Sequence, residues 1–357
     1  MSDQPIDKRA PVLVTGATGY VAGWIVKTLL ERGHTVHAAV RDPKKKDKLR
    51  HLDALAEASD GSIRYFAADL LKPGSYAEAM AGCAVVFHTA SPFTSDFEDP
   101  VKELIEPAQL GTRNVLEEAT RTPSVKRVVL TSSCAAIYGD NADLSATPRG
   151  VFDEDVWNTS SSVEHQPYSY SKTLAEREAW SIAEKQSQWD LVVMNPCLVM
   201  GPGTSPHATS ESFAILRQFG DGTLKMGAPR FGMGVVDVRD LAEAHYRGAY
   251  TPSAKGRHVI AGHDTDLAEW GAILRPKYGD RFPLPTRTLP KWMLWLVGPM
   301  TNESLTRKSV SLNVGLPWRG DNTKSVRELG MTYRPLEDTI TEMFQQMVDA
   351  EGFEKAS

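Results

Sequence analysis

The sequence predicts an α/β protein in which a doubly wound parallel sheet is followed by a smaller C-terminal lobe. Short apolar runs alternate with segments of helical spacing as far as Val199, which is typical of parallel strands joined by crossover helices. A glycine-rich turn follows the first apolar run, and a Tyr-x-x-x-Lys pattern lies further along the chain. After Gly203 the period changes and proline becomes more frequent, which indicates the second lobe.

The first elements along the chain predict a nucleotide site. Residues 12–15 are expected to form a strand, residues 16–19 a glycine turn and residues 24–30 a helix. Gly33 would end that helix, and residues 35–40 would form a second strand. Gly16 permits a tight turn, and Gly19 lets the backbone approach a pyrophosphate at the helix N-terminus. A glycine turn without a ligand has the same pattern, so the prediction rests on the order strand, turn, helix and strand.

The residues after the second strand indicate which dinucleotide binds. Arg41 can form charged hydrogen bonds with a 2′-phosphate, and Lys48 could add a second positive charge. Asp42 supports the rival interpretation, because an NAD site usually places an acidic residue there for the ribose. We favour NADP on the strength of Arg41. The next strand ends at Asp69 and Leu70, which could contact the adenine edge.

Small and polar residues follow two later strands. The strand at residues 84–89 ends in Thr89 and is followed by Ser91, which leaves room for the nicotinamide ribose. The next strand leads to Ser133, and ligands meet the carboxyl ends of strands in a doubly wound sheet. A serine at that place can form hydrogen bonds with a substrate carbonyl and with the phenol of Tyr168.

Tyr168 and Lys172 are four residues apart, which places them on one face of a helix. A phenol ordinarily titrates near pH ~10, and a neighbouring ammonium stabilises the phenolate and lowers that pKa. The pair therefore suits a general acid that gives a proton to a substrate oxygen. An isolated match of this kind more often marks a solvated helix face, so the interpretation depends on the nucleotide site upstream.

From Val12 to about Met347 the chain resembles the extended short-chain dehydrogenase/reductase family. The resemblance rests on residues 15–20, 131–133, 168 with 172, 195–202, 237–242 and 325–330. Within that family the chain is similar to the dihydroflavonol reductase and cinnamoyl-CoA reductase group, through residues 41–43, 87–92 and 153–157.

The resemblance implies an NADPH-dependent carbonyl reductase. Ser133 would orient the carbonyl, Tyr168 would protonate its oxygen, and Lys172 would hold the nicotinamide ribose. Asn114 sits where related enzymes often have an anchoring asparagine, although Pro107 interrupts its helix pattern. The resemblance also implies that a homodimer could form. The expected cofactor contacts are Gly16, Gly19, Tyr20, Val21, Arg41, Lys48, Asp69, Leu70, Thr89, Ser91, Tyr168, Lys172, Pro196 and Val199.

Three alternatives stay open. A sugar-nucleotide epimerase or dehydratase shares the fold and triad but normally retains NAD, and a dehydratase would need an acidic residue where Cys134 stands. A hydroxysteroid dehydrogenase is a closer relative. A non-catalytic NADP-binding sensor would commonly lose the Tyr–Lys pair. Tyr138, five positions after Ser133, argues against a flavonoid substrate, since flavonoid reductases commonly carry a small polar residue there.

Composition limits the partners. The net charge of −5 argues against a nucleic-acid partner. The partner that the resemblance implies is a small carbonyl substrate. The three cysteines have no metal or redox spacing, and their odd number argues against a disulfide framework, so we expect a cytoplasmic location. The histidines near the strands are interpreted as structural residues, so we expect no metal site. No apolar run reaches the ~20 residues of a membrane span. Residues 289–297 are expected to pack over the substrate pocket, and the alternative is that they rest on a membrane surface.

Two lobes divide the chain in this interpretation. We expect an NADP-binding Rossmann domain at residues 10–200, with its sheet completed by about residues 235–262. Residues 203–235 and 263–347 are expected to form the substrate-binding lobe.

Overall fold

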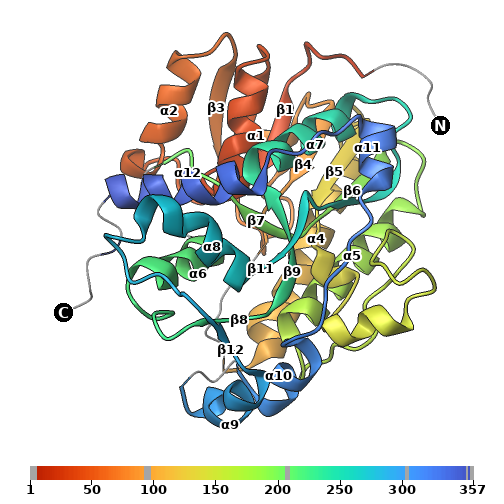
Figure 1. Cartoon of the computed structure of the whole chain (residues 1–357). Helices are drawn as coiled ribbons and strands as arrows, with labels where there is room; N and C mark the ends of the chain where they lie inside the picture. The colour runs from red at the N-terminus through yellow and green to blue at the C-terminus, as the bar shows by residue number, and fades with distance from the viewer. Residues whose placement is uncertain (1–5, 92–97, 206–209, 302–304, 351–352, 354–357) are drawn as a thin grey trace.

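A seven-stranded parallel sheet forms the centre of the molecule, which confirms the predicted α/β class (Figure 1). The computed structural model describes residues 6–91, 98–205, 210–301, 305–350 and 353. The strand order is β10-β6-β5-β4-β1-β2-β3. Their bounds are β1 (Val12–Thr15), β2 (Thr35–Val40), β3 (Ser62–Ala67), β4 (Val85–His88), β5 (Arg127–Thr131), β6 (Asp190–Pro196) and β10 (Gly256–Ile260). Every residue of β1 and β4 is buried, as expected for central strands that are covered on both faces.

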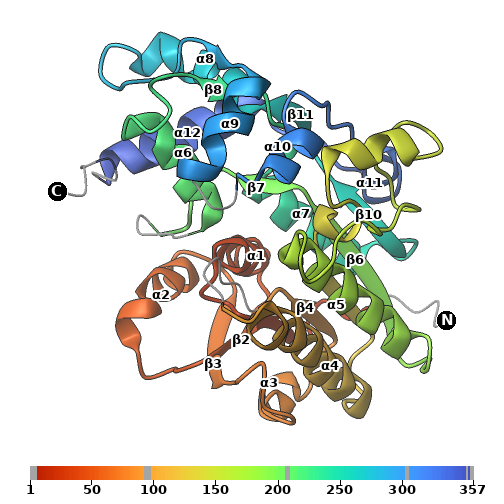
Figure 2. The same cartoon turned by 90° about the horizontal axis from the view of Figure 1, so that it is seen from below.

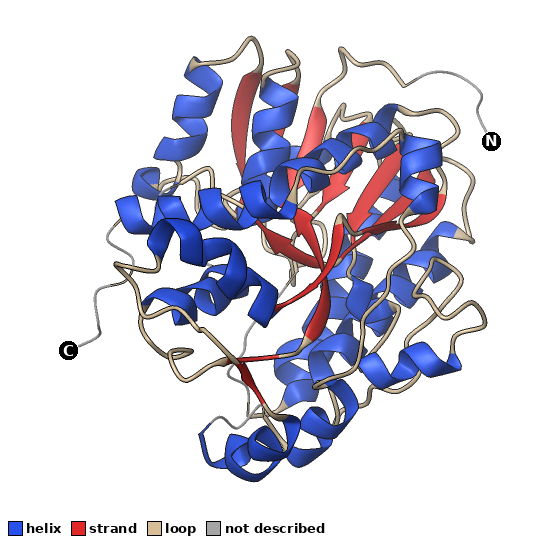
Figure 3. Ribbon diagram, in the orientation of Figure 1, coloured by secondary structure: helices blue, strands red, loops and turns tan. Residues whose placement is uncertain are grey.

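Helices cover both faces of this sheet (Figures 2 and 3). One layer holds α1 (Tyr20–Leu30), α2 (Arg50–Glu57), α7 (Val238–Tyr250) and α11 (Thr323–Leu329). The opposite layer holds α3 (Ala77–Met80), α4 (Glu106–Arg121) and α5 (Pro167–Ala183). Each layer packs its own apolar cluster against the strands, so the sheet lies between two cores.

The remaining elements form a smaller lobe with its own apolar core. A three-stranded sheet has the order β11-β9-β7, with β7 (Leu198–Met200), β9 (Gly232–Asp237) and β11 (His263–Asp266). The core helices are α6 (Glu211–Gly220), α8 (Leu267–Tyr278) and α12 (Leu336–Asp349). The other lobe elements are β8 (Ala228–Pro229), β12 (Thr288–Leu289), α9 (Lys291–Thr301) and α10 (Arg307–Asn313).

The prediction that residues 235–262 complete the large sheet is correct only for β10. That strand pairs with β6 in parallel, and so it occupies the free edge of the large sheet. β9 pairs instead with β7 and β11 in the small sheet. Two glycines of β9 let the segment at residues 316–318 pack closely against this strand, since a Cβ on Gly234 would lie 2.4 Å from the ring of Trp318. The helix that follows, α7, returns to pack against α1 and the large sheet.

Pro107 does not interrupt its helix. A single turn of π-helix at Val101–Ile105 leads directly into α4, and Pro107 lies in the first turn of that helix. A proline is tolerated there because its missing N–H would have no helical partner. The rest of α4 is therefore regular, and Asn114 faces inward as a buried residue.

α9 carries large apolar side chains on the surface. Trp292 and Met300 are 67% and 85% exposed. The predicted packing of residues 289–297 over a pocket therefore leaves much of this segment uncovered. Within the described ranges, no helix has the length and apolar character needed to cross a bilayer.

Truncation of a core leucine is expected to destabilise the protein strongly. Leu29 of α1 is fully buried, so Leu29→Ala should lower the free energy of unfolding by about 2–5 kcal/mol. Leu296→Ala is the matched control, because Leu296 is half exposed and its truncation should change stability by about 0.5 kcal/mol or less. Denaturant unfolding measures both, and equal losses would contradict the described packing.

Candidate active site

The turn after β1 lies at the point where the strand order reverses. β1 has β2 on one side and β4 on the other, so successive crossovers leave a crevice at the carboxyl ends of β1 and β4. Gly16 has φ +63°, and a Cβ there would lie 3.2 Å from Cα and Cβ of Ala90, which follows β4. The backbone therefore comes close without a side chain, and this cradle fits a dinucleotide pyrophosphate.

The N-terminus of α1 leaves its amide groups without a side-chain cap. Gly19 is the N-cap residue, and it has no side chain with which to accept a hydrogen bond from this first turn. Tyr20 uses its hydroxyl elsewhere, donating to the carbonyl of Gly201 at 2.6 Å, and its ring packs edge-on against Phe213. The Tyr20 hydroxyl is therefore engaged, which leaves the backbone N–H groups of Tyr20 and of its half-buried neighbour Val21 as the groups that could meet a cofactor phosphate at this terminus.

Two charged residues lie together at the ends of β2 and β3. Burial raises the pKa of Tyr76, Asp69 adds to the rise, and Arg41 opposes it, so both charges lie near this ring. Arg41 and Lys48 are exposed. One carboxylate oxygen of Asp42 accepts a backbone N–H two residues later at 2.9 Å, so this side chain takes part in a local turn.

Asn114 fixes the loop that follows β3. Its Nδ2 donates to the carbonyl of Leu70 at 2.9 Å. Leu70 also packs against Gly111 of the same helix, where a Cβ would lie 2.5 Å from the leucine side chain. The sequence pattern gave Asn114 little weight because of Pro107, whereas the folded chain uses it to hold an expected cofactor contact.

Thr15 joins the ends of β1 and β4. Its hydroxyl accepts the N–H groups of Thr89 and Ala90 at 3.1 and 3.0 Å. The hydroxyl of Thr89 donates back to the carbonyl of Thr15. Ser91, two residues further, accepts a hydrogen bond from Nζ of Lys172 at 2.9 Å. Two of the expected cofactor contacts, Ser91 and Lys172, are therefore in direct contact.

Ser133, Tyr168 and Lys172 come together at the carboxyl ends of β4 and β5. Ser133 caps the short 3₁₀ turn Cys134–Ala136, and its hydroxyl accepts the N–H of Ala135 at 3.1 Å. A hydrogen bond links the Ser133 and Tyr168 side chains. Nζ of Lys172 lies 5.7 Å from the centre of the Tyr168 ring, one helical turn away.

Burial dominates the pKa values of this pair. It raises the pKa of Tyr168 to about 12, and the hydrogen bond from Ser133 only partly opposes the rise. It lowers the pKa of Lys172 to about 8. The expected lowering of the Tyr168 pKa by Lys172 is therefore wrong for the protein without a cofactor, because removal from water outweighs any attraction to the ammonium.

The last two expected cofactor contacts lie where the chain leaves the large sheet. Pro196 is the buried end of β6, and Val199 is a half-buried residue of β7. Between them, Cys197 brings its Sγ to 2.6 Å from Sγ of Cys134. The spacing of the two cysteines in the sequence gave no sign of this contact. In the described part of the chain, no three His, Cys, Asp or Glu side chains gather as a metal site.

A buried carboxylate on α5 supports the site, and the sequence analysis missed it. Oε2 of Glu176 accepts hydrogen bonds from Ser132 Oγ and from Asn195 Nδ2 at 2.5 and 2.7 Å. Asn195 Nδ2 also donates to the carbonyl of Ser133 at 3.1 Å. Glu176 follows Lys172 by four residues, so the helical spacing that selected Tyr168 and Lys172 could have found it.

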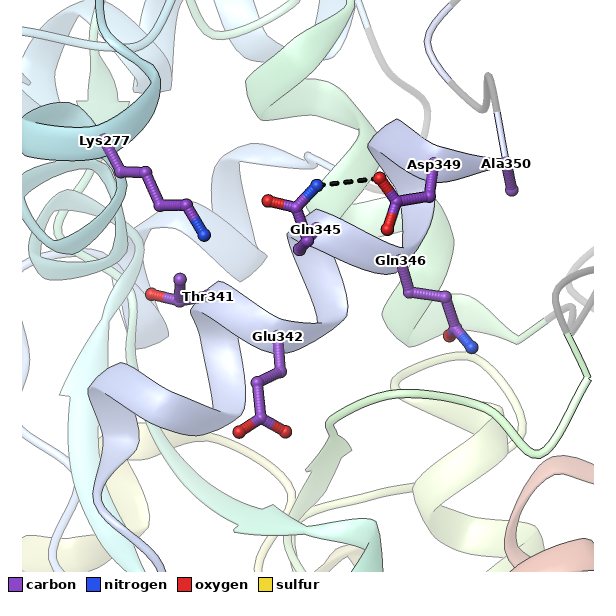
Figure 4. A pocket seen from close by; sticks show the side chains of 7 residues that line it. All are labelled: Lys277, Thr341, Glu342, Gln345, Gln346, Asp349 and Ala350. Carbon is purple, nitrogen blue, oxygen red and sulfur yellow. Dashed lines mark hydrogen bonds between the residues drawn. The ribbon is translucent and has the colours of Figure 1, made fainter.

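A surface hollow of about 380 Å³ lies between α8 and α12, away from these residues. Figure 4 shows its polar side chains along one side of α12, with Lys277 opposite. It contains none of the expected catalytic or cofactor residues, so we do not assign the active site to it.

Known proteins with similar sequences are plant reductases. The chain is 37% identical to cinnamoyl-CoA reductase CAD2 of Medicago truncatula over 94% of this chain and 95% of that protein. It is 33% identical to dihydroflavonol 4-reductase of Gerbera hybrida over 79% of this chain and 76% of that protein.

Solved structures have the same fold. Yeast methylglyoxal/isovaleraldehyde reductase Gre2, complexed with NADPH, superimposes with a TM-score of 0.74 at 25% identity, covering 96% of this chain and 100% of the other. Vestitone reductase from alfalfa superimposes with a TM-score of 0.73 at 24% identity, covering 97% and 100% of the two chains.

The family model described as the NAD dependent epimerase/dehydratase family matches residues 12–262. This match and the plant relatives confirm the resemblance that the motifs indicated. The chain therefore belongs to the NAD dependent epimerase/dehydratase family, in its cinnamoyl-CoA reductase and dihydroflavonol reductase group.

Proposed function

We propose that this protein is an NADPH-dependent carbonyl reductase that converts an aldehyde or ketone to an alcohol. The observation that carries the proposal is the hydrogen bond between Ser133 and Tyr168, with Lys172 one turn along the same helix. These groups lie beside the crevice at the strand-order reversal, where ligands of doubly wound folds bind. Reductase names among the similar proteins support the same reaction.

Each residue of the triad has one task in this mechanism. The raised pKa of Tyr168 keeps its phenol protonated at neutral pH, so it is ready to give a proton to the carbonyl oxygen. Ser133 would hold that oxygen by a hydrogen bond. Lys172, already in contact with Ser91, would hold the nicotinamide ribose and stabilise the phenolate that remains. When bound, NADPH supplies the hydride to the carbonyl carbon.

NADPH is favoured over NADH by the charges at the end of β2. Arg41 is exposed there and can reach a 2′-phosphate, whereas a carboxylate oxygen of Asp42 is engaged in a local turn. This arrangement counts against the epimerase alternative, which normally retains NAD. The NADPH complex of the similar yeast reductase supports the choice.

Removal of the Tyr168 hydroxyl is expected to abolish turnover. Tyr168→Phe should lower kcat by roughly 100-fold or more, because the proton donor is lost, while NADPH affinity stays unchanged. Oxidation of NADPH, followed at the nicotinamide absorbance with a panel of aldehydes, ketones and hydroxycinnamoyl thioesters, measures the loss. Tyr170→Phe, two residues along the same helix, is the matched control. Retained turnover in Tyr168→Phe would disprove the assignment of the acid.

Loss of the Arg41 guanidinium is expected to reduce the preference for the 2′-phosphate. Arg41→Ala should weaken NADPH binding by roughly 10- to 100-fold and leave NADH binding almost unchanged, since a charged hydrogen bond is worth about 1.5–3 kcal/mol. Cofactor fluorescence titration gives both dissociation constants. Lys45→Ala removes a nearby exposed charge as a control, and equal losses for both cofactors would contradict the proposal.

Lys172 is expected to titrate well below an ordinary lysine. Burial disfavours its charged form, so the amine should become neutral and reactive as the pH rises through about 8. Acetylation rates across pH 6–11, followed by peptide mass mapping, measure this midpoint, with the free ε-amine of Nα-acetyl-lysine, at a pKa of about 10.4, as the reference. A midpoint close to the reference value would mean that Lys172 is fully hydrated.

A further inference from the structure

A buried carboxylate joins three parts of the molecule near the start of α5. Asp140 is 1% exposed and lies just before the short helical turn at Asn141–Ala146. Its Oδ1 accepts hydrogen bonds from Asn313 Nδ2 at 2.6 Å and from Gln166 Nε2 at 3.3 Å. Its Oδ2 lies 2.6 Å from Nε2 of His165. Both oxygens are therefore engaged with groups from other segments.

Gln166 has an unusual backbone conformation for its position. Gln166 has φ 57° and ψ 52°, and among the residues that the structure describes it is the only non-glycine residue with a positive φ. It is the N-cap of α5, where an extended conformation is usual, and Pro167 follows. A residue with a side chain persists in this left-handed region only when its surroundings enforce it. The bond to Asp140 is one of the contacts that hold Gln166, two residues before Tyr168.

The same carboxylate is fixed to the smaller lobe. Asn313 is the last residue of α10, and its Oδ1 accepts the N–H of Asn141 at 2.9 Å. Asn141 in turn donates from Nδ2 to the carbonyl of Gly232 at 2.7 Å, at the start of β9. A displacement of α10 or β9 would therefore reach the start of α5 through Asp140.

We propose that Asp140 is a positioning residue for Tyr168, acting through Gln166, and that it links the direction of the phenol to the placement of the smaller lobe. The proposal rests on the function proposed above, in which Tyr168 is the acid. Asp140 itself contacts Gln166, His165 and Asn313, so its role is to orient the acid.

Asp140→Asn tests whether Asp140 positions Tyr168, and it replaces the carboxylate by an amide of nearly the same size. The amide has one acceptor oxygen where the carboxylate has two, so its NH₂ group must face either His165 or the donors of Asn313 and Gln166, and the contacts on that side are weakened or lost. We expect kcat to fall by roughly 10- to 100-fold, as displacement of a reacting group by about 1 Å can do, with NADPH affinity within about twofold of wild type. The solvent deuterium isotope effect on kcat should rise, because proton transfer from a misaligned Tyr168 becomes slower than hydride transfer.

Asp143→Asn is the matched control. Asp143 accepts the N–H groups of Gly139 and Asp140 and the hydroxyl of Ser160, so it stabilises the same loop without touching Gln166. A purely structural role for Asp140 would lower the melting temperature in both variants and leave both isotope effects at the wild-type value. That result would overturn the proposal.

Two substitutions of Gln166 keep the test decisive if Asp140→Asn does not fold. Both glycine and alanine lack the bond to Asp140, but glycine adopts the left-handed conformation without strain, whereas alanine retains the strain. Gln166→Ala should therefore lower kcat and raise the solvent isotope effect more than Gln166→Gly does. Wild-type values in both variants would disprove the proposal.

Tyr168→Phe separates the two proposals. If Tyr168→Phe keeps its turnover, Tyr168 is not the acid and the proposed function fails. If Tyr168→Phe is inactive while Asp140→Asn and both Gln166 variants turn over normally, only the positioning role of Asp140 fails.

Discussion

The buried ion pair between Glu176 and Arg257 is the interaction on which the active-site region depends. Glu176 lies on α5 and is 1% exposed, and Arg257 lies on the edge strand β10 and is 6% exposed, with Nε and Oε1 2.6 Å apart. Two charges removed from water are tolerated only when their remaining groups are hydrogen-bonded. Arg257 meets this condition by donating to the carbonyls of Ala136, Glu154 and Val156.

The consequence is that one carboxylate orients the groups proposed for catalysis. Glu176 holds Asn195, which holds the backbone of Ser133, while α5 itself carries Tyr168. Loss of either charged partner would leave the other buried and unpaired, at a cost of about 3–5 kcal/mol. Stability and the direction of the catalytic side chains are therefore supported by the same contacts.

The nucleotide crevice and the smaller lobe are also physically joined. Tyr20 and Trp24, both on α1, donate to the carbonyls of Gly201 and Pro202 at 2.6 and 2.7 Å, where the chain enters the lobe. The start of α1 is therefore held by residues of the same segment that leads to the substrate side. Asp140 makes a second connection, between the start of α5 and the end of α10. A movement of the lobe would act on both.

The sheet, the glycine turn and the Tyr–Lys pair could be predicted from the sequence, because each depends on local spacing: alternation of strands and helices, Gly16 at a turn with positive φ, and a separation of four positions from Tyr168 to Lys172. Only the tertiary structure decided that β9 joins a separate sheet, since β10 already covers the edge of β6. The same holds for the burial that raises the pKa of Tyr168, for the bond of Glu176 to Asn195 and for the contact of Asp140 with Gln166. Burial and long-range hydrogen bonds depend on which segments meet in space, and spacing along one chain does not encode those meetings.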